Sequence, residues 1–159
     1  MRRKRWPLLT LIGLLMVAGG VFLFKKVNVL HLENMDHPRA IHLRISPDEK
    51  FSMFYIHSIY EESVTEEFQA EKGAILLKGV RTKSPGVMEY YGFDDIKEFT
   101  PMNQKLGAVF IMRRGMGEGQ GLIVRDRKIY LSEIGEKGDR IQVRVESVSL
   151  GRYLLGQFM

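Results

Sequence analysis

The chain of 159 residues contains no cysteine, and it has only one tryptophan and five prolines. The lack of cysteine excludes disulfides, thiolate zinc sites, iron–sulfur clusters, cysteine nucleophiles and a lipoprotein-type lipid anchor. Residues 27–159 are enough for one ordinary domain, and a domain of that length buries a core large enough to be stable without disulfides or a structural metal. The sequence therefore predicts a single domain after an N-terminal segment.

The chain also lacks an excess of positive charge outside its N-terminus. The first 26 residues carry six basic residues and no acidic one, whereas the remaining residues carry 18 basic and 19 acidic ones. A nucleic-acid-binding domain needs its basic residues clustered on the folded face that meets the phosphates. The net charge of +5 therefore does not indicate a nucleic-acid partner.

One long apolar run lies near the N-terminus. No ionisable residue occurs from Leu8 to Phe24, and a helix over 6–24 would be about 28 Å long, close to the hydrocarbon thickness of a bilayer. We expect 1–26 to form a cytoplasmic basic stub and a transmembrane signal-anchor that contacts the lipid bilayer through 7–24. The flanking basic residues then place the rest of this single-pass protein outside the cytoplasm, at the cell membrane. The small residues Ala18 and Gly20 leave a cleaved signal peptide as the alternative to an anchor. With either an anchor or a signal peptide, the domain is exported.

Alternation of apolar and polar residues predicts strands through the rest of the chain. The clearest runs are 41–45, 51–59, 64–70, 74–80, 106–112, 122–124, 129–131 and 141–145. Short strands separated by turn residues are typical of an all-β antiparallel sandwich or barrel-like domain. We assign this domain to 50–159. The preceding residues, 27–49, are expected to form a juxtamembrane spacer and a first strand.

Two segments are less regular than the predicted strands. Ser84–Asp95 contains several aromatic residues, which indicates a loop that packs its own rings or covers the end of a sheet or a pocket. Gly115–Gly121 has glycine at every second position, but no phosphate-binding pattern fits these residues, so we expect a mobile hairpin loop.

The runs 51–59 and 64–70 predict a hairpin with a testable register. If Ile59 faces Val64, His57 lies opposite Glu66 on an otherwise apolar face, within reach of an imidazole–carboxylate hydrogen bond. In a buried pair of this kind, the two residues either satisfy each other's polar groups, or they contact a ligand or respond to pH. Both interpretations of His57 and Glu66 stay open.

The sequence offers little for catalysis or metal binding. Ser58 and His57 are neighbours on a predicted strand, so their side chains point to opposite faces and cannot act as nucleophile and base. No nucleophile-elbow motif is present. His31, His37 and His42 lack a spacing that fixes a metal, and a solvated surface position is expected for each. We therefore expect no enzyme activity, no cofactor and no metal site.

One stretch resembles a known family. The matching residues are Tyr55, His57 and Ser58, then Val64, Glu66 and Phe68, then Ser84 and Gly86 after a hydrophobic strand. They are similar to the pattern of the domain of unknown function 1850 family, over most of the exported domain and most specifically over about 20 residues. Members are typically encoded beside, or fused to, membrane subunits of TRAP transporters of the TAXI subclass.

The resemblance implies an exported accessory protein of such a transporter. Its partner would be the transporter's membrane subunit or the solute-binding protein. A ligand-binding or pH-sensing β domain centred on His57 and Glu66 is the alternative function.

Overall fold

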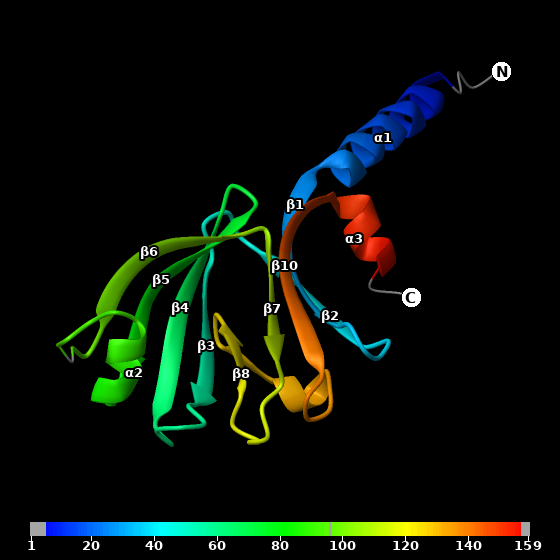
Figure 1. The fold of residues 1–159 in the computed structure, drawn as a ribbon. Helices are drawn as coiled ribbons and strands as arrows, with labels where there is room; N and C mark the ends of the chain where they lie inside the picture. The colour runs from blue at the N-terminus through cyan, green and yellow to red at the C-terminus, as the bar shows by residue number, and fades with distance from the viewer. Residues whose placement is uncertain (1–5, 96, 157–159) are drawn as a thin grey trace.

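The computed structural model describes residues 6–95 and 97–156, which form two antiparallel sheets and a helix that projects from one end of them (Figure 1). The predicted all-β antiparallel fold is confirmed. In the first sheet the order is β2 (Ala40–Ile45), β1 (Lys26–Asn34), β10 (Arg140–Ser149) and β7 (Val109–Arg113). In the second it is β6 (Thr100–Gly107), β5 (Ala74–Thr82), β4 (Ser63–Glu71), β3 (Lys50–Ile56), β8 (Gly121–Val124) and β9 (Arg127–Tyr130).

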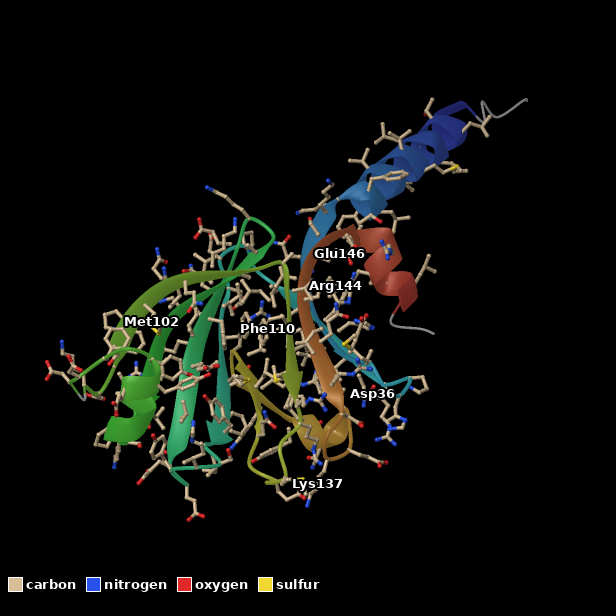
Figure 2. The ribbon with its side chains drawn as sticks, viewed as in Figure 1. Asp36, Met102, Phe110, Lys137, Arg144 and Glu146 are labelled. Carbon is tan, nitrogen blue, oxygen red and sulfur yellow. The ribbon has the colours of Figure 1, made fainter. Side chains whose placement is uncertain are left out.

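The two sheets share one apolar core. Leu30 and Leu32 of β1 and Val143 of β10 are fully buried on the inner face of the first sheet. Phe68 of β4 stacks on Phe110 of β7 with ring centroids 5.4 Å apart, which joins the sheets across the core. Phe110 is labelled in Figure 2. Alternating burial along each strand follows from the two-residue period of its side chains.

Residues 26–34 are not a spacer, and this part of the predicted domain organisation is wrong. β1 lies between β10 and β2 and pairs with both over most of its length. Val29 and Leu30 are adjacent, and both are buried because one faces the outer side of the sheet and the other faces the core. Because both faces of β1 are covered, apolar residues occur on both of them, and the sequence of this strand does not alternate regularly between apolar and polar residues.

Four helical segments complete the fold of residues 6–95 and 97–156. A helix forms where the apolar run predicted one, and its last residue lies two positions before β1 starts. No helix in the described part of the chain is both long and apolar enough to cross a membrane. The predicted membrane crossing therefore stays a prediction. The segments are α1 (Trp6–Phe24), α2 (Pro85–Tyr90), the 3₁₀ turn η1 (Leu131–Glu133) and α3 (Leu150–Gly156).

Candidate functional site

The β3–β4 hairpin does not bring His57 and Glu66 together. Glu66 pairs with Met53, and Tyr55 pairs with Val64, so the register differs from the predicted one while the same side chains face the core. His57 lies beyond the end of β3. It begins the connecting loop, where its backbone N–H donates to Glu62 O at 2.9 Å. The predicted His57–Glu66 contact is wrong.

The observed register has a physical cause in the core. It places Phe51 opposite Phe68, and the two rings stack with centroids 5.3 Å apart. The longer loop is closed by a hydrogen bond from the backbone N–H of Glu61 to His57 O at 2.8 Å, and Glu61 adopts a left-handed backbone conformation with φ 52°. The predicted register would place Tyr55 opposite Phe68, whereas the observed one pairs Phe68 with the wholly apolar Phe51 and lets the Tyr55 hydroxyl bond to Glu66.

Glu66 has tyrosine partners instead of a histidine. Its Oε1 accepts a hydrogen bond from the Tyr91 hydroxyl and a weaker one from the Tyr55 hydroxyl at 3.4 Å. The two hydroxyl oxygens are 3.1 Å apart. Tyr91 is the C-cap of the helix α2 (Pro85–Tyr90), so this small network links the edge of the core to the aromatic segment.

Burial dominates the electrostatics of this network. It raises the pKa of Glu66 above its ordinary value, although hydrogen bonds from Tyr91 and Tyr55 act in the opposite direction. Burial and the nearby Glu66 carboxylate raise the pKa of Tyr55 to about 12, and the same two causes raise the pKa of Tyr91. Both phenols therefore stay protonated donors, and Glu66 is the group in this network that titrates most easily.

The remaining residues of the family pattern have structural positions. Val64 and Phe68 are buried in the core, and Ser58 is exposed in the β3–β4 loop. Ser84 is the N-cap of α2, and its Oγ accepts from the backbone N–H of Val87 at 3.3 Å. A side chain at Gly86 would overlap the Tyr60 ring, so glycine allows α2 to approach the β3–β4 loop. The aromatic segment thus contains a capped helix that the sequence analysis did not predict.

Three segments that the sequence singled out meet at one end of the second sheet. The β3–β4 loop, the end of α2 and the glycine-rich segment Gly115–Gly121 border a cleft of about 570 Å³. Tyr55, His57, Tyr90 and Met116 are among the residues that line it. The glycine-rich segment joins β7 to β8, which belong to different sheets, so it is not the predicted hairpin loop. A cleft that combines aromatic rings with polar side chains such as Glu61 and Gln120 could hold a small ligand.

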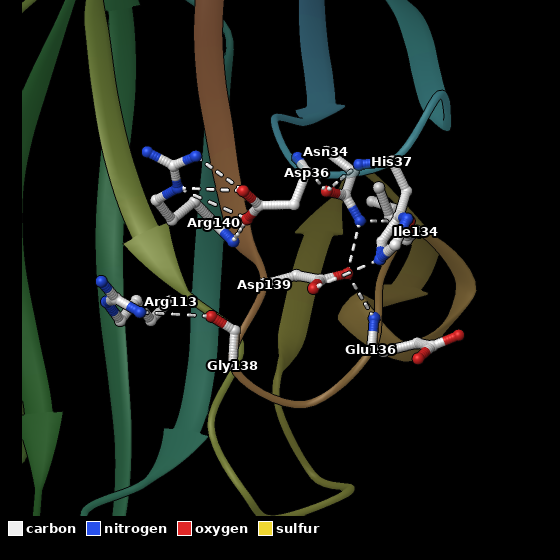
Figure 3. Close-up of polar contacts among 9 residues, drawn as sticks. All are labelled: Asn34, Asp36, His37, Arg113, Ile134, Glu136, Gly138, Asp139 and Arg140. Carbon is white, nitrogen blue, oxygen red and sulfur yellow. Dashed lines mark hydrogen bonds and ion pairs between the residues drawn. The ribbon is translucent and has the colours of Figure 1, made fainter.

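His37 belongs to a separate polar cluster at the β1–β2 turn (Figure 3). Asn34 Oδ1 accepts from the backbone N–H groups of Asp36 and His37, and its Nδ2 donates to Asp139 at 2.7 Å. Arg140 binds Asp36 at 2.6 Å and lowers the pKa of that carboxyl to about 2. These contacts fasten the turn to the start of β10, which is a structural role.

His31 and His42 form a second candidate site that the sequence analysis missed. They are directly paired between β1 and β2, and their Nδ1 atoms are 2.8 Å apart. Glu33 lies on the same face, and ligand atoms of the three residues are all within 4.8 Å of one another. The sequence contains a signal for this pair. If 26–34 is recognised as a strand, a turn at 36–38 brings residue 31 opposite residue 42.

No protein-family model, curated protein or solved structure matches this chain.

Proposed function

We propose that this protein is a membrane-attached extracytoplasmic accessory domain that acts by binding and not by catalysis. The observation that carries the proposal is the surface of α1, whose apolar side chains are exposed around the whole helix. A helix that is apolar on every side is stable only in apolar surroundings, such as lipid or another protein. The exposed side chains are Leu9, Leu11, Ile12, Leu14, Leu15, Met16, Val17, Val21, Phe22, Leu23 and Phe24.

The connection to the β domain supports membrane attachment. α1 ends at Phe24 and β1 begins at Lys26, so almost no linker separates the helix from an inner strand of the first sheet. A side chain at Gly151 of α3 would lie 3.4 Å from the Leu23 carbonyl, so α3 packs closely against the last turn of α1. With α1 in lipid, the domain is held directly at the membrane surface, and the basic residues at 2–5 favour a cytoplasmic N-terminus.

Membrane attachment is tested by extracting membranes with alkaline carbonate. The full-length chain should stay in the pellet, and a variant with Leu14→Lys and Val17→Lys should be released, because each charge in a bilayer costs about 3 kcal/mol. Lys72→Ala, a change in the exposed β4–β5 turn, is the control and should behave as the parent. Release of the parent chain by carbonate would contradict insertion of α1.

The partner that we propose is a TRAP transporter, either its membrane subunit or its solute-binding protein. The support is the resemblance carried by Tyr55, Ser58, Val64 and Phe68, together with the proposed attachment. Fixing a domain beside its partner raises its effective concentration to about millimolar, so a weak interface is sufficient.

Copurification under mild detergent tests this partner. The chain should retain the membrane subunit or the solute-binding protein encoded with it, and should still do so when α1 is replaced by an unrelated membrane anchor. Retention that depends on α1 alone would assign the interaction to the helix. Repeated failure of both forms to retain either component would contradict the transporter proposal while leaving membrane attachment intact.

A second candidate function is ligand binding in the cleft beside His57. The convergence of three irregular segments around Tyr55, His57 and Tyr90 favours it. Native mass spectrometry of protein purified from its host membrane should then detect a bound molecule that is lost in Tyr90→Ala and kept in Lys72→Ala. A molecule held equally by both variants would lie elsewhere, and this function would be refuted.

A further inference from the structure

The outer face of the first sheet carries a compact group of metal-binding side chains. His31 and Glu33 are two positions apart on β1 and therefore point to the same face, and His42 lies on the neighbouring strand directly opposite His31. The His31 side chain is only 13% exposed. These three residues supply two imidazole nitrogens and a carboxylate within 4.8 Å of one another.

Glu146 indicates which nitrogen of His31 carries the proton. Its Oε2 lies 3.8 Å from His31 Nε2, and both atoms are buried without a hydrogen-bond partner within the described residues. A proton on Nε2 faces this carboxylate favourably, whereas a lone pair there would be repelled by it. The lone pair of His31 is therefore on Nδ1, which is the atom that faces His42. A carboxylate behind a ligating histidine is the usual outer-shell arrangement of metal sites.

The surroundings favour the neutral form of His31. Burial lowers its pKa most, and the neighbouring His42 and Arg144 lower it further, against smaller opposite effects of Glu146 and Glu33. A histidine must be neutral to bind a metal ion. Arg144 also fixes the two carboxylates, since its guanidinium lies 3.4 Å from Glu33 Oε1 and 3.3 Å from Glu146 Oε2.

Space for an ion and its water ligands is available beside these residues. His31, Glu33 and His42 line a cavity of about 690 Å³ that is also bordered by Arg144 and by residues of α3. Arg144 and Glu146 lie on β10 next to α3 (Figure 2). A site with three protein ligands and an open side is one in which solvent completes the coordination.

We propose that His31, His42 and Glu33 bind one divalent transition-metal ion, with Glu146 as the residue that positions His31. Two imidazoles and one carboxylate suit Zn²⁺, Co²⁺ or Ni²⁺ better than Mg²⁺ or Ca²⁺, which prefer oxygen ligands only. Metal–nitrogen bonds of about 2.0–2.1 Å in a tetrahedral site separate the two nitrogens by about 3.3 Å, so the rings move apart by about half an ångström. The inference does not depend on the function proposed above.

The test is metal titration of the full-length protein, prepared in detergent without a polyhistidine tag. Isothermal titration with Zn²⁺ should give one ion per chain. Glu146→Gln should weaken binding about 10- to 100-fold, and His31→Ala or His42→Ala should weaken it by more than about 100-fold. His37→Ala is the matched control, because that histidine lies in the β1–β2 turn and should leave affinity unchanged.

Absorption spectra with Co²⁺ separate binding from positioning. Glu146→Gln should keep the ligand-field bands of the parent complex and lose only affinity, whereas His42→Ala should change the bands themselves. Melting curves without metal establish whether each variant is folded. If His42→Ala does not fold, His42→Gln replaces it in the titration and the spectra. A plain hydrogen-bonded histidine pair predicts no stoichiometric binding. That result, or equal affinity of the parent and both histidine variants, would overturn the proposal.

Discussion

Replacement of Glu66 tests whether its partners are tyrosines. In Glu66→Ala, the Tyr91 and Tyr55 hydroxyls lose their shared acceptor, but they can still bond to each other across 3.1 Å. One buried hydroxyl is then left unsatisfied, so the free energy of unfolding should fall by about 1–3 kcal/mol. For a chain of this size that lowers the melting temperature by roughly 2–12 °C. Glu66→Gln keeps an acceptor without the buried charge and should cost less.

The pH dependence sharpens this prediction. Because the pKa of Glu66 is raised in the folded protein, the folded state holds its proton more tightly than the unfolded state. The associated stability is complete below the ordinary value of 4.5 and is lost as pH rises through the folded value. Glu66→Gln should abolish that decline.

Urea unfolding followed by far-UV circular dichroism at several pH values is the suitable assay. The only tryptophan is Trp6, in α1, so its fluorescence does not report on the β domain. His57→Ala is the control and should leave the pH dependence unchanged. If His57→Ala removed the decline and Glu66→Gln did not, the tyrosine network described here would be refuted.

Three further predictions concern the β1–β2 turn, the close approach of β8 to β9 at Gly121, and the apolar core. Asp36→Asn should remove a loss of stability that the parent shows as pH falls from 3.8 to about 2, because Arg140 holds the pKa of Asp36 low; acid titration followed by circular dichroism measures this. Gly121→Ala should lower the free energy of unfolding by about 1–3 kcal/mol in urea, since the new Cβ meets the backbone carbonyl of Ile129. Phe68→Ala should lower it by about 3–5 kcal/mol, because its ring is 2% exposed and stacked on both sides.

Local alternation was enough to predict most of the strands and much of the core. It missed β1, and it gave one strand at 106–112 where the chain forms the end of β6 and most of β7. Val64 and Phe68 are buried as their two-residue period indicates, and the hairpin of β3 and β4 exists. Its register was not predictable from polarity, because both alignments keep the same residues on the inner face. They differ in whether Phe51 or Tyr55 lies against Phe68, and that choice depends on how the rings pack in the assembled core.

The candidate sites depend on contacts that sequence patterns do not display. Glu66 meets Tyr91 across a separation of 25 residues, and only the placement of α2 brings them together. The His31–His42 pair required β1 to be recognised as a strand. Its partner β10 comes from the other end of the chain, so nothing local to His31 marks that strand as central.

The topology of the chain is the most direct test of the central claim. Since the protein has no cysteine, a single cysteine introduced at Lys72 can be labelled with a membrane-impermeant maleimide without background. Lys72→Cys should react in intact cells, or in spheroplasts if an outer membrane is present, and Arg3→Cys should react only after the membrane is opened. Labelling of Arg3→Cys in intact cells, with Lys72→Cys protected until lysis, would contradict the proposed extracytoplasmic location.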